Sequence, residues 1–216
     1  MPIPVKYLKS AESAIASYSY ADIADGTGNI VFYGYDYNES GVKYYRLTQT
    51  AIFSQDIETT GDGFAAGVTG DNKSLDLDFD VTLNSPRIIK GDAKVIASFN
   101  NKITGGVMDA ALLYKFRKWD GAAETFLASG SSMRISNNTV DTVTTIINIP
   151  RTHFKKGETI RLTVEDWSLA KQAGFAASGT TLTHDPKDRD GTVIIPSTDA
   201  TDTSKLEVHI PFVLDL

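Results

Sequence analysis

Apolar and polar residues alternate with a period of two along most of the chain. Over residues 75–83, five apolar side chains alternate with Asp76, Asp78, Asp80 and Thr82. Successive side chains on a β-strand point to opposite faces, so this segment predicts a strand with one core face and one face of three carboxylates. Carboxylates two positions apart lie about 7 Å from each other, too far for acid–base chemistry on one atom. We expect a solvated outer face; binding of cations or of a basic partner surface is the alternative.

The same alternation recurs in short segments separated by clear turns. Aromatic and β-branched residues are enriched over 30–37 and 43–54, and the intervening NESG contains a glycine, so these segments predict a hairpin. The Asp-Gly pair of WDGAA and the glycine of KKGE mark two more turns. Further strands are predicted at 93–99, 109–119, 124–129, 142–149, 159–167, 180–183 and 205–216.

Many short strands with hardly any helical pattern are typical of a β-sandwich or a barrel. Strand number and length favour two packed layers. We therefore predict an all-β fold, a jelly-roll-like β-sandwich of two antiparallel sheets, as one domain over residues 29–216. Pro211 falls within the last predicted strand, and because proline cannot donate to a β-ladder we expect it at an edge or a bulge.

The first 28 residues carry the only helical spacing. Leu8, Ala11, Ile15 and Tyr18 recur at helical intervals, and Ser10 is a candidate N-cap. An extended arm that becomes ordered against a partner explains the segment equally well. We expect an N-terminal arm or a short helix over residues 1–28.

Composition and charge exclude several classes of protein. The chain has 216 residues, a hydrophobic content of 41% and no cysteine, which allows a packed core but no disulfide, thiol nucleophile or cysteine–zinc site. The net charge of -6, without a basic run, argues against nucleic-acid binding. There is no apolar stretch long enough to span a bilayer and no signal-peptide pattern, so we expect synthesis in the cytoplasm and no membrane contact.

The segment THDPKDRDGTVIIP, residues 183–196, invites comparison with a calcium loop. Counting back from Gly191 places Pro186 where the first ligand belongs, and no glutamate stands at the twelfth position. A looser calcium site built from carboxylates and backbone carbonyls is the alternative. Its carboxylates would be those of Asp185, Asp188 and Asp190. We favour a loop shaped by proline and glycine with solvated charges, without a metal or other cofactor.

Catalytic patterns are missing from the sequence. His153, His184 and His209 lie on three separate segments, without a Gly-x-Ser-x-Gly elbow or a His-Glu-x-x-His pair. Glu165 and Asp166 are adjacent on a predicted strand, so their side chains point to opposite faces and do not form a cooperating pair. We therefore expect no catalytic residues and no enzymatic activity.

Tyrosines are concentrated in the first predicted hairpin. Tyr33, Tyr35 and Tyr37 share one face of a strand, and Tyr44 lies across the turn. Exposed tyrosines can stack on sugar rings, and they are enriched at protein interfaces. Cross-strand packing inside the sandwich is the third interpretation. These four residues are our candidates for an interface or a glycan site.

Two stretches resemble known jelly rolls. FKKGETIRLTVEDW is similar to the glycine turn and following strand of tumour-necrosis-factor-like proteins. The layout of ASYSYADIADGTGNIVFYGYDY, NIPRTHFKKGETIRLTVEDW, HDPKDRDG and LEVHIPFVLDL resembles that of jelly-roll virion proteins of tailed bacteriophages, of the capsid-decoration or head–neck type. The resemblance implies a structural component, often trimeric, whose N-terminal arm attaches it to other virion proteins.

The function expected from this resemblance is a non-enzymatic structural component of a phage virion. It would be made in the host cytoplasm and act as a homo-oligomer, with a trimer favoured, through contacts with the major capsid protein or neighbouring structural proteins. A carbohydrate-binding jelly-roll module that recognises a receptor or glycan is the alternative, with Trp119 and Trp167 as further aromatic candidates.

Overall fold

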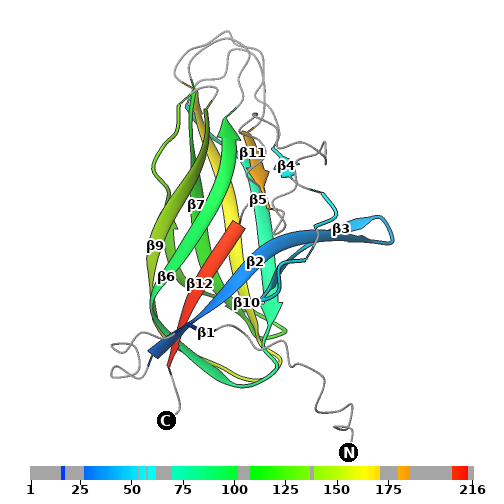
Figure 1. The fold of residues 1–216 in the computed structure, drawn as a ribbon, viewed down its shortest axis with the longest axis vertical. Coiled ribbons are helices and arrows are strands. Elements are labelled where there is room, and N and C mark those ends of the chain that lie inside the picture. Colours follow the sequence, from blue (N-terminus) through cyan, green and yellow to red (C-terminus); the bar gives the residue numbers. More distant parts are fainter. Residues whose placement is uncertain are drawn as a thin grey trace, which may run out of the picture.

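The computed structural model describes residues 16–17, 27–52, 54–56, 58–61, 70–101, 108–136, 139–170, 180–184 and 206–213 (Figure 1). Within these ranges the chain forms strands and no helix, which confirms the predicted all-β class. Accordingly, no described helix is long and apolar enough to cross a membrane.

The strands follow the alternating segments of the sequence, and several extend beyond them. The turn residues explain where strands end: Ser40, Gly41, Gly121 and Gly157 have positive φ angles and close the predicted NESG, WDGAA and KKGE turns. The strands are β1 (Ala16–Ser17), β2 (Thr27–Glu39), β3 (Val42–Thr48), β4 (Glu58–Thr60), β5 (Gly70–Thr82), β6 (Arg87–Asn101), β7 (Met108–Trp119), β8 (Glu124–Ser131), β9 (Thr139–Phe154), β10 (Thr159–Ala170), β11 (Thr180–Thr183) and β12 (Leu206–Val213).

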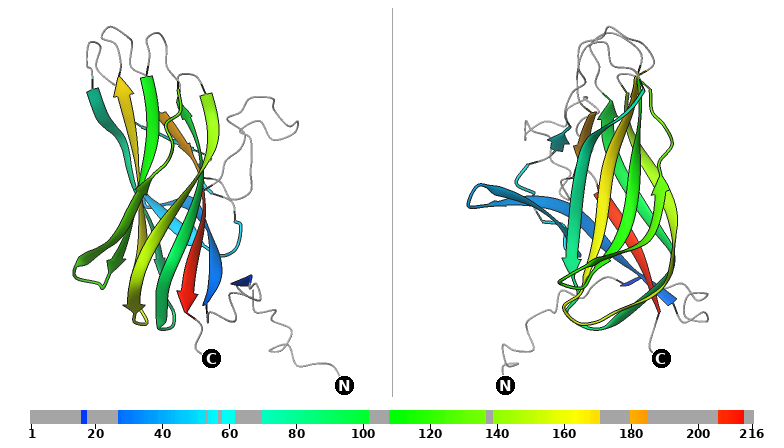
Figure 2. Two further views of the ribbon diagram at one scale, coloured as in Figure 1. Left: turned by 90° about the vertical axis from the view of Figure 1, so that its left-hand side faces the viewer. Right: turned by 180° about the vertical axis from the view of Figure 1, so that it is seen from behind.

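Eight long strands form two antiparallel layers (Figure 2). One layer, the β2 layer, has the order β2-β12-β6-β9; the other, the β5 layer, has the order β5-β10-β7-β8. The chain crosses between the layers from β5 to β6, from β6 to β7, from β8 to β9 and from β9 to β10, in the manner of the predicted jelly roll, while β7 and β8 form a hairpin within the β5 layer. The layers are nevertheless not separate sheets, because β3 pairs with β2 and also makes one parallel pair with β5, Arg46 with Asp80.

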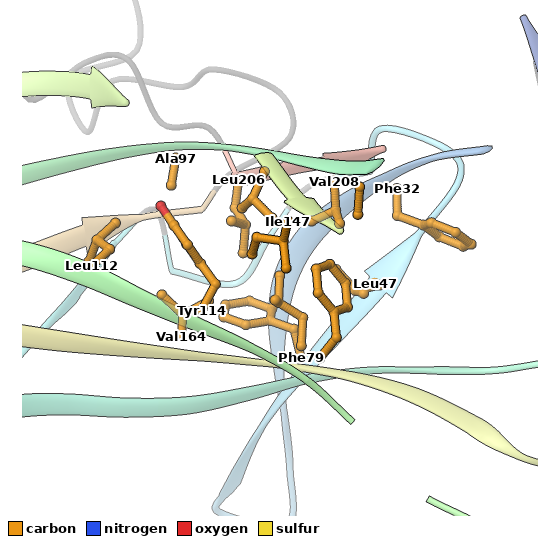
Figure 3. Packing of buried hydrophobic residues seen from close by; sticks show 14 of the residues in the cluster. Phe32, Leu47, Phe79, Ala97, Leu112, Tyr114, Ile147, Val164, Leu206 and Val208 are labelled. Carbon is orange, nitrogen blue, oxygen red and sulfur yellow. The ribbon is translucent and has the colours of Figure 1, made fainter. Parts of the chain in front are cut away.

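The core lies between the two layers and is built from the inward-facing residues of both (Figure 3). Leu75, Leu77 and Phe79 are buried on β5, while Asp76 and Asp78 between them face outward, as the alternation predicted. Burial of these apolar side chains away from water is the main stabilising contribution to such a fold.

Pro211 lies on β12 between two hydrogen-bonded neighbours, β2 and β6. The pairing of β12 with β6 is irregular between His209 and Phe212, so the proline occupies a bulge where the missing N–H does not interrupt the ladder. The sequence predicted that Pro211 would lie at an edge or a bulge, and the structure shows the bulge.

The N-terminal segment is described only at Ala16 and Ser17, which are extended and pair with Ile30 and Asn29 of β2. Ala16 and Ser17 are therefore not helical. The rest of the candidate helix, residues 8–15 and 18, lies outside the described residues.

Candidate functional site

The candidate tyrosines lie together on the β2–β3 hairpin, which projects from the sandwich (Figure 1). The Tyr37 ring stacks on Tyr35, with centroids 6.2 Å apart, and on Tyr44, with centroids 5.3 Å apart. The Arg46 guanidinium lies 5.7 Å from the centre of the Tyr44 ring. All four candidate tyrosines are partly exposed, and Tyr35, Tyr37 and Tyr44 form a stack outside the core. Tyr33 lies on the same strand face as Tyr35 and Tyr37.

The candidate calcium residues Asp185, Asp188 and Asp190 lie outside the described residues. Their neighbour His184 is described and is fully buried. Among the described residues, no group of three or more His, Asp or Glu side chains is close enough to hold a metal ion.

His184 is held between two hydroxyl groups. Its Nε2 lies 2.9 Å from Thr59 Oγ1, and its Nδ1 lies 3.3 Å from Ser54 Oγ. Ser54 donates its hydroxyl proton to Asp36 Oδ1 at 2.5 Å, so we assign the imidazole proton to Nδ1, which donates to Ser54, and let Nε2 accept from Thr59. The contacts join β2, β4, the segment after β3 and the end of β11.

This set contains the residue types of a serine-hydrolase triad, but its electrostatics favour a structural role. Burial lowers the pKa of His184 to about 4, although the Asp36 carboxylate opposes the shift. Burial also raises the pKa of Asp36, but hydrogen bonds from Ser54 and the Asp56 backbone, with His184 and Lys43 nearby, outweigh it and hold that pKa below its ordinary value. A fully buried imidazole with so low a pKa is a poor general base at neutral pH.

The stripe of three carboxylates on β5, formed by Asp76, Asp78 and Asp80, is neutralised within the chain. Arg161 on β10 binds Asp80 through Nε–Oδ1 at 2.8 Å and Nη2–Oδ2 at 2.9 Å, and it also contacts Asp78 and Glu124. Hydrogen bonding to Asp80 raises the pKa of Arg161, so its charge is fixed at all relevant pH values. Asp76 pairs with Lys73 at 2.5 Å. The carboxylate stripe is therefore the outer surface of the β5 layer, held by cross-strand ion pairs.

Glu165 and Asp166 point to opposite faces of β10, as predicted. Glu165 faces outward and accepts hydrogen bonds from Lys115 Nζ at 2.5 Å and from Trp167 Nε1 at 2.9 Å. Burial raises its pKa, but Lys115, Trp167 and Lys73 outweigh this effect, so the net pKa is lowered and the group is a carboxylate. Asp166 is fully buried inside the sandwich.

A pocket of about 350 Å³ lies on the outer face of the β5 layer, beside Trp167. Trp167 is paired in register with Ala111 of β7, whose small side chain leaves space beside the indole. Asp71 and Asp109 also line the pocket; both are paired with Leu169, one on each side of β10. Arg134, in the segment that follows β8, supplies a positive charge at the wall.

Sequence reasoning found Trp167 as an aromatic candidate but missed the charged residues around it. Asp71, Asp109 and Arg134 are far apart in the chain and carry no motif. The one available signal was an outward-facing tryptophan on a predicted strand, a position where such a large apolar ring is unusual unless it meets a ligand or a partner.

Sequence comparisons return no match: no family model and no curated protein matches the chain. Solved structures with a similar fold do exist. A CocE/NonD family hydrolase from Staphylococcus aureus matches with a TM-score of 0.50 and 14% identity over 92% of this chain and 37% of the hydrolase. A second structure of a hydrolase of that family and species gives a TM-score of 0.49 and 14% identity, over 84% of this chain and 36% of that one.

An α-amino acid ester hydrolase gives a TM-score of 0.40 and 12% identity over 85% of this chain and 35% of its own length. This chain thus spans little more than a third of the hydrolases it matches. At such low identity the likeness establishes the fold alone.

These neighbours correct the expected function. The structure that matches this fold over 92% of the chain with a TM-score of 0.50 is that of a hydrolase and not of a phage structural protein. The expectation of a non-enzymatic structural component of a virion, with a glycan-binding module as its alternative, was therefore wrong. It had relied on a general strand layout, and unrelated functions share such a layout because function resides in local sites.

Proposed function

We propose that the chain is the ligand-binding jelly-roll module of a hydrolase and that the Trp167 pocket holds a small cationic compound with an apolar body. The observation that carries this proposal is the meeting of an indole with two carboxylates in one pocket of about 350 Å³. Such a volume falls in the range of small-molecule sites.

The charges of the pocket favour a cation. Asp71 and Asp109 contribute two negative charges and Arg134 one positive charge, so the ionised side chains leave a net charge of -1. An ammonium group placed over the face of a tryptophan gains a further cation–π attraction of about 0.5–2 kcal/mol. A singly charged amine therefore neutralises the site.

The indole is held in place before any ligand arrives. Trp167 Nε1 donates to Glu165, and Glu165 is itself bound by Lys115 and approached by Lys73 at 3.7 Å. A ring fixed by such contacts loses little conformational freedom on binding, which improves affinity.

The residues that line this pocket suit binding of a ligand better than cleavage of a bond. Ser131 and Ser132 line it, but none of the three histidines does, so neither serine has an imidazole beside it to act as a base. The likeness to about a third of a larger hydrolase supports a role in which this module holds the substrate while another part of the enzyme cleaves it.

The proposal is tested by fluorescence titration of a Trp119→Phe variant, in which Trp167 is the remaining one of two tryptophans. We expect 2-phenylethylamine to change the emission saturably and to bind at least about tenfold more tightly than 2-phenylethanol, which lacks the charge. Asp71→Asn and Asp109→Asn should each weaken amine binding, whereas Asp141→Asn, an exposed aspartate on β9, should not.

Equal affinity for the amine and the alcohol, or unchanged amine binding in both pocket variants, would overturn the proposal. Phenylalanine methyl ester carries both an ammonium group and a hydrolysable bond, so it separates binding from catalysis. We expect the chain alone to bind this ester without cleaving it. Turnover that disappears in a Ser132→Ala variant would show instead that the chain is itself the catalyst.

A further inference from the structure

Polar side chains lie inside the sandwich at inward positions where apolar residues are expected. Asp166 and Ser168 on β10 and Tyr114 on β7 are fully buried, and Thr145 on β9 is 7% exposed. Five oxygen atoms of this group have no hydrogen-bond partner among the described residues. They are Asp166 Oδ1 and Oδ2, Ser168 Oγ, Tyr114 Oη and Thr145 Oγ1.

Tyr114, Thr145 and Asp166 approach one another from three strands, and Ser168 follows Asp166 by two positions on the same face of β10. Burial is the main cause of a raised pKa at Tyr114, but its hydroxyl is also close enough to Thr145 and Asp166 for both to influence that pKa. In Figure 3 the Tyr114 hydroxyl points across the core toward Ala97 of the opposite layer. Within its own layer, Asp166 is paired in register with Leu75 and Leu112, so apolar side chains flank the carboxyl group on both sides.

The surroundings of Asp166 supply hydroxyl groups and no positive charge. Ser74 of β5 donates to the backbone carbonyl of Asp166 at 3.3 Å, and its hydroxyl lies 2.8 Å from that of Thr180 on β11. Burial raises the pKa of Asp166, and the nearby Thr180 hydroxyl opposes this effect, although no hydrogen bond of ordinary geometry reaches the carboxylate from the described residues. Within the described residues no ion pair involves Asp166, and Tyr114 is the titratable group that faces it.

An ionised carboxylate without a counter-charge is very costly in a protein interior. Buried oxygen atoms without a partner in such numbers call for a further partner, and ordered water or an ion can supply one. A proton on Asp166 neutralises the charge but supplies only one donor, which leaves most of the five oxygens without a partner.

We propose that this group binds one alkali-metal cation, sodium or potassium, through the Asp166 carboxylate and the hydroxyl oxygens of Ser168 and Tyr114. Carboxylate and hydroxyl oxygens are hard ligands suited to such ions, and a single positive charge balances the single carboxylate. Calcium is a poorer match, because it takes six to eight oxygen ligands and usually several carboxylates. The site is separate from the Trp167 pocket, which lies on the opposite face of β10, and does not depend on its function.

The experiment is thermal unfolding of the full chain at pH 8 in sodium chloride, potassium chloride and choline chloride at equal ionic strength. Choline is too large for the interior, so it controls for screening of surface charges. The comparison is repeated in an Asp71→Asn variant, which weakens any binding of choline itself to the Trp167 pocket. We expect sodium or potassium to raise Tm saturably, by about 3–6 °C at tenfold excess over Kd. At pH 5, where a proton competes for Asp166, the difference between the salts should disappear.

Two variants locate the effect. Asp166→Asn should remove the dependence on alkali cations, and Asp78→Asn, which alters a carboxylate on the outer face of β5, should keep it. Identical Tm values in the three salts for the wild-type chain would overturn the proposal and leave ordered water as the occupant. A dependence retained in Asp166→Asn would overturn it as well. If Asp166→Asn does not fold, the pH 5 comparison on the wild-type chain decides.

Discussion

The substitution Asp166→Asn tests how the buried carboxyl group affects stability. Asp166 is fully buried, and burial raises its pKa from 3.8 to about 7. In the unfolded chain the group titrates near its ordinary value. Because the folded-state pKa is higher, the stability associated with the neutral carboxyl is fully present below about pH 3.8. It is lost as the pH rises to about 7.

The magnitude follows from the difference in pKa. A shift from 3.8 to about 7 is about three units, and each unit corresponds to about 1.4 kcal/mol, so ionisation of Asp166 costs the fold about 4 kcal/mol. This is a large part of the 5–15 kcal/mol by which native domains are usually stable. Asparagine has nearly the same shape and cannot ionise, so it should avoid this cost.

The assay is urea unfolding of the wild-type chain and of Asp166→Asn between pH 4 and pH 8, in buffers without alkali cations. The free energy of unfolding of the variant, relative to wild type, should rise by about 4 kcal/mol across this range. Other carboxylates titrate equally in both proteins and cancel in the difference. A difference that does not change with pH would refute the reasoning, because it would mean that Asp166 is ionised or solvated throughout.

Three further predictions concern other parts of the fold. Burial lowers the pKa of His184 from 6.5 to about 4. The stability contributed by the neutral imidazole is therefore present above pH 6.5 and lost as the pH falls through 4. The variant His184→Asn should accordingly show a smaller loss of Tm than the wild-type chain between pH 7 and pH 4. In urea unfolding, Gly61→Ala should lower the free energy of unfolding by about 1–3 kcal/mol. The new Cβ atom would lie 2.6 Å from the backbone oxygen of Ser74, which is too close. An unchanged free energy of unfolding would show that the backbone relaxes there. Arg161→Met should cost about 1 kcal/mol at low salt and less at high salt, since Arg161 is partly exposed and Asp80 keeps only its ion pair with Arg46. A loss independent of salt would indicate packing as the cause.

The period-two alternation determined the all-β class, the position of most strands and the orientation of their side chains. It placed Leu77 and Phe79 inside and Asp78 outside, and it placed Glu165 and Asp166 on opposite faces, all as the structure has them. These are local properties, since the geometry of an extended backbone fixes which side each residue faces. The alternation did not predict that the inward-facing carboxyl group of Asp166 would lack a partner among the described residues.

Which residues meet across the sheets was decided only by the tertiary structure. Arg161 reaches Asp80 across 81 positions of the chain, and His184 reaches Ser54 across 130, because β10 lies beside β5 and the end of β11 packs near the segment after β3. The Trp167 pocket likewise needs β10 between β5 and β7. Strand order and register depend on long-range pairing and on burial of the common core, and the alternating pattern within one strand is compatible with many such arrangements. The sequence therefore determined the faces of the strands, and the packing of the whole chain decided which residues those faces bring together.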